Sequence, residues 1–380
     1  MLANGNGNVV DAIYFDFAKA FDTVPHRRLL KKLKGYGIDG KILEWIKSFL
    51  QNRTQSVKVN GIFSNVASVK SGVPQGSVLG PILFILYIND LPDVIQSDVL
   101  LFADDTKIFR SINSAKDAEL LQSDIDALSR WSQDWLINFN LEKCHVLTMG
   151  KFERIKHVER YKLDKHELEH VFEEKDLGVI FYSELKFEEH ISAKVQKANA
   201  ITGLIRRSFT YLDGQLLKKL FSSFVRPHLE YACAVWSPFL KKNITAIENV
   251  QRRGTKLIDG FFNLTYDERL RRLNLPTLQY RRERSDMIEI YKHFDGYDPR
   301  TISPNFVRNP RSSRQHDYQL RRKTPKDGIR GPQTNSFYYR AFKTWNELPR
   351  SIVHSPSIVI FKKALDAEWK DRQLFARSDS

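Results

Sequence analysis

The 380-residue sequence predicts an α+β fold, in which an antiparallel sheet with packed helices is followed by a mostly α-helical region. Short apolar runs alternate with helical patterns as far as Phe181, and helical periodicity dominates from Glu188 to about Tyr291. The length is enough for roughly two or three domains. Hydrophobic residues make up 42% of the chain, which is enough to form their cores.

The N-terminal segment, as far as Val69, is predicted to contain one buried strand, two helices and a hairpin. Val9–Phe15 is a nearly continuous apolar run that Asp16 ends, which predicts a buried strand. Pro25 opens a short basic helix, and the apolar spacing over Ile38–Leu50 predicts another. Asn60-Gly61 between short alternating runs is typical of a hairpin turn.

The alternation of helix and strand continues as far as Met149. Val78–Leu91 is apolar around most of its circumference, which predicts a buried helix with Pro81 in its first turn. Two apolar runs on either side of Asp104-Asp105 predict a second hairpin with two acids at its tip. Ser114 and Asp117 resemble the capping box of a long amphipathic helix, and Cys144–Met149 indicates another strand.

A further strand is predicted over Asp176–Phe181, and the remainder of the chain is mostly helical. The helical pattern is interrupted near Tyr211–Gly214, at Pro227, at Pro238 and near Gly260. Pro299–Pro332 contains nine basic residues against two acids, which is typical of a linker or a nucleic-acid-binding arm. An ordered pattern returns over Phe337–Trp369.

Acidic residues at predicted strand ends are the candidates for chemistry. Asp16 ends one apolar strand, and Asp104-Asp105 separate two others. A carboxylate among apolar strand residues is costly unless it is paired or bound to a metal. Taken singly, each has an ordinary interpretation, because Asp is a common turn former.

Three segments that occur in order change this interpretation. They read FDFAKAFD from Phe15, SGVPQGSVLGP from Ser71 and FADD from Phe102. The set resembles motifs A, B and C of reverse transcriptases, specifically those of non-LTR retrotransposons of the LINE type, such as jockey-like elements. The similarity extends to the segment Trp345–Pro349 and so covers most of the chain.

The resemblance implies a site of carboxylates and divalent metal ions for RNA-directed DNA synthesis. In two-metal nucleotidyl transfer, a primer 3′-hydroxyl attacks the α-phosphate of a dNTP, and the ions stabilise the attacking and leaving oxygens. Asp16 and Asp104 would bridge the ions, Phe17 would contribute its main-chain carbonyl, and Asp105 would be a peripheral carboxylate. Two Mg²⁺ ions are expected, with Mn²⁺ as a substitute.

Four residues would contact the nucleotide if the resemblance holds. Phe21 matches the steric gate, whose ring crowds a ribose 2′-hydroxyl, and Gln75 and Gly76 match motif B residues that line the nascent base pair. Lys143 lies where the family often has a lysine that protonates the pyrophosphate leaving group. The plain alternatives are core packing for Phe21, a simple turn for Gln75-Gly76 and a solvated side chain for Lys143. Leu177-Gly178-Val179 resembles the primer-grip hairpin, with a plain strand turn as the alternative.

Positive charge is concentrated in the second half of the chain. The net charge is +15, yet residues 1–200 carry 26 Lys and Arg against 27 acids, whereas residues 201–350 carry 29 against 14. Such an excess indicates a polyanionic partner contacted through its phosphates. Any single basic pair is explained as well by a solvated helix face. The candidate pairs are Arg206-Arg207, Lys218-Lys219, Lys241-Lys242, Arg252-Arg253, Arg271-Arg272 and Arg281-Arg282.

By this resemblance, residues 1–185 would form the polymerase palm, residues 186–295 a helical thumb-like region and residues 296–380 a basic linker and C-terminal region. The implied partners are an RNA template, a DNA primer and a dNTP. Only 15 residues precede Asp16. We therefore expect the family's fingers to be largely missing, its upstream endonuclease to be absent, and little polymerase activity from these residues alone.

Cysteine content and hydrophobicity favour an intracellular protein without a membrane partner. Cys144 and Cys233 are too few for a disulfide framework, which fits a reducing compartment, whether nucleus or cytoplasm. The longest apolar run, Val78–Ile88, is about half a membrane span.

Two other functions stay open. A non-catalytic nucleic-acid-binding remnant of a mobile element would bind primer–template with salt-dependent affinity, but without primer extension. A two-metal nuclease is the weaker alternative, because the context of Phe21 and Gln75 suits the selection of a nucleotide.

Overall fold

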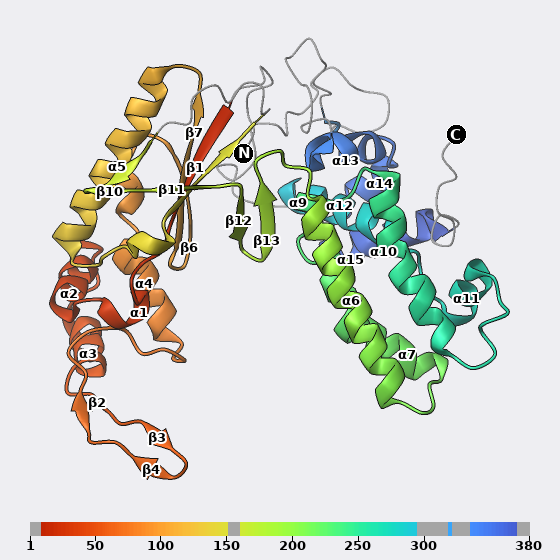
Figure 1. The fold of residues 1–380 in the computed structure, drawn as a ribbon, viewed down its shortest axis with the longest axis horizontal. Helices are drawn as coiled ribbons and strands as arrows, with labels where there is room; N and C mark the ends of the chain where they lie inside the picture. The colour runs from red at the N-terminus through yellow and green to blue at the C-terminus, as the bar shows by residue number, and fades with distance from the viewer. Residues whose placement is uncertain (1–8, 151–159, 295–317, 321–334, 371–380) are drawn as a thin grey trace. The chain divides into compact units, whose positions relative to one another are not determined.

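The computed structural model describes residues 9–150, 160–294, 318–320 and 335–370, and the chain divides into two compact units (Figure 1). The first unit ends at Glu174 and the second begins at Lys175. Both units contain helices and strands, which confirms the predicted mixture of helix and sheet. None of the described helices combines the length and apolar character needed to cross a bilayer.

A five-stranded sheet with the order β11-β8-β1-β7-β6 forms the centre of the first unit. β1 lies in the middle and is antiparallel to β7 and β8, whereas β11 runs parallel to β8. The sheet is therefore mixed, and the prediction of an antiparallel sheet was wrong at this edge. The stretch of chain between β8 and β11 is long enough for the crossover that a parallel pair needs. The strands are β1 (Val9–Phe15), β6 (Asp98–Phe102), β7 (Asp105–Ile112), β8 (His145–Met149) and β11 (Glu169–Val171).

Helices pack against this sheet and bury one continuous apolar core. α5 packs on β7, and α2 packs on α3 and α4. Fully buried members of the core are Leu29 from α2, Phe84 from α4 and Leu121 from α5. The predicted capping box of Ser114 and Asp117 is formed at the start of α5. The helices are α1 (Ala20–Thr23), α2 (His26–Gly35), α3 (Gly40–Leu50), α4 (Leu79–Ile88), α5 (Ala115–Trp135) and the short 3₁₀ helices η1 (Leu91–Val94) and η2 (Leu141–Lys143).

Two small ladders follow α3, and a third lies between β8 and β11. The predicted turn at Asn60-Gly61 is confirmed, and both residues have positive φ, as a tight hairpin requires. Figure 1 shows hairpin β3–β4 projecting from the end of α3. The paired strands are β2 (Thr54–Gln55) with β5 (Ala67–Ser68), β3 (Lys58–Val59) with β4 (Ile62–Phe63), and β9 (Lys162–Leu163) with β10 (His166–Glu167).

A hairpin over residues 173–182 contains the predicted strand Asp176–Phe181, and its turn lies at Leu177-Gly178, where a hairpin or a strand turn was expected. β12 (Glu173–Asp176) and β13 (Val179–Tyr182) pair across a turn at Leu177 and Gly178, which have φ of 46° and 79°. The hydroxyl of Tyr231 donates to the Leu177 carbonyl at 2.9 Å, so the turn is held in place. A primer-grip role for this hairpin stays a prediction.

Helices make up the rest of the described second unit, and Pro227 does not interrupt them. The π-helix Phe221–Val225 joins α7 to α8 directly, so the predicted break was wrong. The wider π turn accommodates the missing N–H and the ring of proline. The helices are α6 (Glu188–Ser208), α7 (Gly214–Leu220), α8 (Arg226–Glu230), α9 (Cys233–Trp236), α10 (Lys241–Gly254), the 3₁₀ helix η5 (Thr255–Leu257), α11 (Tyr266–Leu273), α12 (Leu278–Phe294), α13 (Phe337–Asn346), α14 (Arg350–Val353) and α15 (Ile358–Glu368).

The prediction that Phe337–Trp369 forms ordered structure is confirmed, since α13–α15 share a hydrophobic core with α12. The ring of Tyr291 stacks on Phe361 with centroids 4.3 Å apart. The basic segment Pro299–Pro332 lies outside the described residues, except for residues 318–320. The borders of the three predicted domains stay a prediction.

A buried histidine makes the stability of the second unit sensitive to acid. The His190 side chain has no exposed surface; its Nδ1 accepts the Ile180 N–H at 3.1 Å, and its Nε2 has no hydrogen-bond partner among the described residues. Burial, followed by the nearby Lys194, lowers the pKa of His190 to about 4. Since the folded state holds the neutral ring, protonation favours unfolding. Stability should fall as the pH drops from about 6.5 to 4.

We expect His190→Gln to reduce this pH dependence. Urea unfolding at pH 7 and pH 4.5 should show about 2 kcal/mol less acid destabilisation in the variant than in the wild type, because the unfolded-state protonation of His190 is removed. His166→Gln, at an exposed position, is the control and should follow the wild type. An unchanged pH dependence in His190→Gln would contradict the assignment.

Candidate active site

The end of the sheet at which β1 finishes brings the three predicted catalytic acids together. In the register of β1 and β7, Phe15 pairs with Thr106. Asp16 follows Phe15 and Asp105 precedes Thr106, so the antiparallel register places these two acids opposite each other. Phe102 pairs with Asp105 across hairpin β6–β7, which leaves Ala103 and Asp104 as its turn. Strand pairing therefore brings three carboxylates that are distant in the sequence to one end of the central strands. This group of Asp16, Asp104 and Asp105 is called the acidic edge below.

Lys143 lies at this edge and contacts Asp16. Its Nζ is 3.2 Å from Asp16 Oδ2, and the Asp16 side chain is 31% exposed. The main chain fixes the contact, because Asn140 N donates to the Asp16 carbonyl at 2.7 Å just before η2, which ends at Lys143. The Lys143 side chain is 65% exposed, so Lys143 is a solvated lysine that also pairs with a candidate metal ligand, and its role as a proton donor stays a prediction.

The main chain at Phe17 is oriented by a bridge to Phe139. Ala18 N donates to Asn138 O at 2.8 Å, and Asn140 N donates to Asp16 O, which makes Phe17 and Phe139 a non-hydrogen-bonded pair. In such a pair, the N–H and C=O of Phe17 point away from Phe139, toward the β7 side of β1. The Phe17 ring is buried and stacks on Phe139 with centroids 4.7 Å apart. Core packing therefore positions a carbonyl next to Asp16.

The donors at this edge fit a hard divalent cation in kind. Mg²⁺ prefers oxygen ligands and usually takes one or two carboxylates, with phosphate and water oxygens completing its shell. Asp104 is half-buried and Asp105 exposed, so both are accessible to such oxygens. Within the described part of the chain, no group of three or more His, Cys, Asp or Glu side chains is placed so that it could hold a metal ion, so metal binding by Asp16, Asp104 and Asp105 stays a prediction. The number of ions stays a prediction.

Asp11, the other carboxylate of β1, does not belong to the site. It is 3% exposed and accepts the hydroxyl of Tyr161 at 2.7 Å. Burial raises its pKa, which the bond from Tyr161 partly opposes. Asp11 is therefore a structural acid inside the unit.

The motif B loop docks on the segment that follows Asp16. Val73 N donates to the Phe21 carbonyl at 2.7 Å, and Gly72 N donates to the Val24 carbonyl at 2.8 Å. Gly72 has φ of +88°, and a Cβ there would lie 2.8 Å from main-chain atoms of Phe21 and Asp22. The close approach of the two segments therefore requires glycine at this position.

Side chains strengthen this docking, and two of them were not singled out from the sequence. Gln75 Nε2 donates to Asp22 Oδ1 at 3.1 Å, and Ser71 Oγ donates to the Asp22 carbonyl at 2.9 Å. His26 Nε2 lies 2.8 Å from the carbonyl oxygen of Gly72. Asp22 is the last residue of the motif A segment and His26 follows it by four residues, so their proximity to the motif was the available signal.

A family model described as reverse transcriptase (RNA-dependent DNA polymerase) matches residues 5–204, which is more than half of the chain. The chain belongs to the reverse transcriptase family. It is 31% identical over 261 residues to the RNA-directed DNA polymerase from mobile element jockey of Drosophila melanogaster, and 30% identical over 263 residues to that of Drosophila funebris. Each match covers 65% of this chain and 28% of the relative.

A third relative matches a larger share of the chain. The probable RNA-directed DNA polymerase from transposon X-element of Drosophila melanogaster is 28% identical over 346 residues, covering 85% of this chain and 36% of the relative. The chain thus spans about a third of the length of these relatives, or less. Apo telomerase from Candida tropicalis superposes with a TM-score of 0.36 and 14% identity, over 70% of this chain and 45% of that chain.

The family assignment makes the surroundings of the predicted nucleotide contacts relevant. Phe21 is half-buried and its ring stacks on Phe84 with centroids 4.7 Å apart, so the packing interpretation describes at least part of its role. Gln75 and Gly76 are exposed, and Gly76 has φ of +79°. The steric gate and base-pair contacts stay predictions of the reverse transcriptase resemblance.

The predicted nucleic-acid-binding residues of the second unit divide into two groups. Arg252 and Arg253 are exposed at the end of α10 and line a groove of about 380 Å³, in which the Arg252 guanidinium lies 4.5 Å from the Tyr266 ring. A basic groove with an aromatic wall suits nucleic acid. Arg206, Arg207, Lys219 and Lys241 are exposed as well.

Other members of the basic pairs have structural partners. Lys218 Nζ donates to the Asn274 carbonyl at 3.1 Å, just beyond α11, and Lys242 forms an ion pair with Glu188. In the pair Arg281-Arg282, Arg281 forms an ion pair with Glu230 and Arg282 is 4% exposed. A phosphate-binding interpretation was therefore wrong for Arg282, because a buried guanidinium cannot reach a strand in solvent.

Proposed function

We propose that this chain carries the catalytic palm of an RNA-directed DNA polymerase from a non-LTR retrotransposon, followed by a thumb-like helical region. The reaction is transfer of a nucleotide from dNTP to the 3′-hydroxyl of a primer paired with RNA. The observation that supports it most is the register of β1, β6 and β7, which gathers Asp16, Asp104 and Asp105 at one edge beside Lys143.

Each residue at this edge has a distinct role in the proposal. Asp16, Asp104 and the Phe17 carbonyl would hold divalent metal, which when bound supplies charge stabilisation for the attacking and leaving oxygens. Asp105 adds negative charge at the rim. Lys143 holds a proton at Nζ next to Asp16, from where it can donate to the pyrophosphate leaving group. Phe21 and Gln75 would border the sugar and base of the nucleotide.

The test is primer extension by the chain with enzyme in excess over a DNA primer annealed to an RNA template. We expect incorporation of dNTP that requires template and Mg²⁺ or Mn²⁺. Binding of the primer–template is measured in the same samples by fluorescence anisotropy. Omission of the metal and a primer without template are the controls.

The alternative is a non-catalytic nucleic-acid-binding remnant, which the exposed Arg252 and Arg253 groove supports independently of any chemistry. It predicts salt-dependent binding with no incorporation in either metal. That result would contradict the proposed polymerase site.

A further inference from the structure

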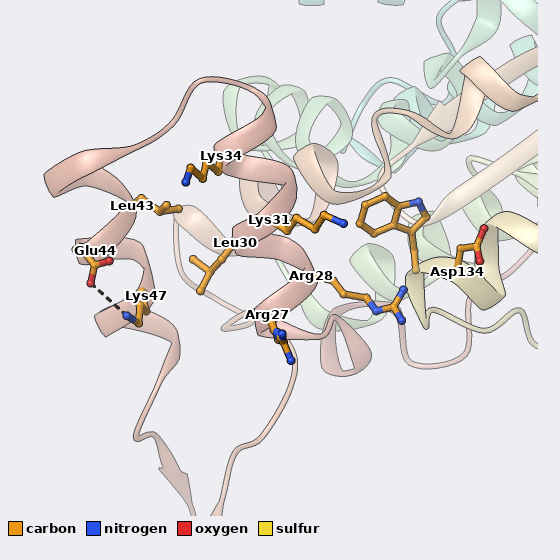
Figure 2. Close-up of a pocket in the computed structure, with 10 residues that line it drawn as sticks. Arg27, Arg28, Leu30, Lys31, Lys34, Leu43, Glu44, Lys47 and Asp134 are labelled. Carbon is orange, nitrogen blue, oxygen red and sulfur yellow. Dashed lines mark hydrogen bonds and ion pairs between the residues drawn. The ribbon is translucent and has the colours of Figure 1, made fainter.

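A second basic groove lies in the first unit, whose sequence is balanced in charge. It is formed by α2, α3 and the end of α5 and has a volume of about 860 Å³ (Figure 2). Five cations line it, together with the acids Glu44 and Asp134. The cations are Arg27, Arg28, Lys31, Lys34 and Lys47.

The amphipathic pattern of α2 separates its basic residues into two groups. Leu29, Lys32 and Leu33 face inward, and Lys32 Nζ donates a hydrogen bond to Asp90 and lies 3.7 Å from the Trp135 ring centroid. Arg27, Lys31 and Lys34 are exposed and recur at spacings of four and three residues, which places them in one stripe along the helix. Lys32 therefore stabilises the unit, while the other cations remain at the groove.

The groove has more positive charge than its own acids neutralise. Lys47 Nζ is 3.4 Å from Glu44 Oε2, an exposed pair that contributes little. Among the described residues, Arg27, Arg28, Lys31 and Lys34 form no ion pair, although Figure 2 shows Arg28 extending in the direction of Asp134. The groove thus presents a cluster of cations that an anionic ligand can neutralise.

We propose that this groove binds the phosphate backbone of a nucleic acid strand. The stripe from Arg27 to Lys34 covers about two turns, or about 10 Å of helix. Phosphates of one strand advance by about 3.4 Å along a duplex axis but lie farther apart along the strand itself, so the stripe is long enough to contact about two of them. Leu30, Leu43 and Trp135 supply an apolar lining against which sugars and bases can lie.

The inference rests on the proposed function, because the strand is part of the primer–template or of its single-stranded template extension. The inference adds a nucleic-acid contact in the first unit, which also contains the acidic edge. The balanced charge of residues 1–200 had given no indication of such a contact. Since only phosphates are contacted, binding at this groove is independent of base sequence.

The test compares two triple variants of the whole chain by fluorescence anisotropy between about 50 and 200 mM salt. The groove variant is Arg27→Gln, Lys31→Gln and Lys34→Gln. The matched control is Lys41→Gln, Lys116→Gln and Lys165→Gln, which removes the same charge from exposed positions of the same unit that do not line the groove. Gln has a helix propensity close to those of Arg and Lys, and thermal unfolding checks that both variants fold.

We expect the groove variant to bind primer–template at least about tenfold more weakly at about 50 mM salt, and its plot of log affinity against log salt to be shallower by about 2 to 3. The control should show a markedly smaller change. A blunt duplex and a duplex with a single-stranded template extension are titrated in parallel, and the one with the larger loss identifies the strand.

Equal primer–template affinity of the groove variant and its control would overturn the inference. The groove would then be a candidate site for an acidic protein partner instead. The proposed function would survive that result, because wild-type binding and extension are measured separately. Absence of salt-dependent primer–template binding by the wild type would instead contradict both.

Discussion

Asp104→Asn is expected to lower the rate of primer extension by about 1,000-fold. Several kcal/mol of transition-state stabilisation depend on the bound metal, and about 4 kcal/mol corresponds to this factor. Asn keeps the size of the side chain and is itself a good turn residue, so hairpin β6–β7 should persist. The loss would therefore report on the carboxylate charge.

Asp98→Asn is the matched control, since Asp98 is exposed at the opposite end of β6. It should extend the primer at the wild-type rate. Mn²⁺ binding, followed by the electron paramagnetic resonance signal of the free ion, gives a second readout that does not depend on turnover. Retention of both the extension rate and Mn²⁺ binding by Asp104→Asn would rule out Asp104 as a metal ligand.

Gly72→Ala is expected to destabilise the first unit by at least about 2 kcal/mol and to abolish primer extension. A left-handed conformation costs a non-glycine residue about 1–2 kcal/mol. The added Cβ would also lie 2.8 Å from the main chain of Asp22, so the motif B loop must move away from motif A. Urea unfolding and primer extension measure the two consequences.

Gly37→Ala is the control that measures backbone strain alone, without the steric clash that an added Cβ at position 72 makes with the main chain of Asp22. Gly37 has φ of +82° and no atom within 4 Å of an added Cβ, so its substitution carries the strain alone. We expect it to cost about 1–2 kcal/mol and to leave extension unchanged. If both variants lowered the free energy of unfolding by the same amount, the close approach of the motif B loop to Asp22 would contribute nothing to stability.

Much of the secondary structure was predictable because its signals are local. The apolar run of β1, the Asn60-Gly61 turn and the capping box of α5 each depend on residues a few positions apart. Pro227 shows the limit of local rules, since a π turn continues the helix through a residue that usually ends one.

The candidate site was predictable in composition but not in arrangement. Motifs A, B and C identified the acids and Gln75 as belonging together, and the resemblance to the family added Lys143. The contact of Lys143 with Asp16 depends on how η2 follows the bridge at Phe139, and no residue spacing encodes that path. Asp22 and His26 were missed because their roles arise from the motif B loop, which is distant from them in the sequence.

Charge was the least predictable property. The excess of Lys and Arg over Asp and Glu predicted a nucleic-acid-binding surface in the second unit, yet Arg282 of that unit is buried. In the first unit, whose charge is balanced, α2 exposes three cations in one stripe. A charge count records how many cations a segment holds, whereas helix packing decides which of them reach solvent.

The order of residues alone thus established the family, the acids that define its motifs and most helices and strands, because these depend on short-range patterns. Tertiary structure decided the register that joins Asp16 to Asp104-Asp105, the parallel edge strand β11 and the faces on which basic residues lie. These features depend on pairing between segments that are distant in the chain, whose energies come from packing and main-chain hydrogen bonds in the assembled sheet.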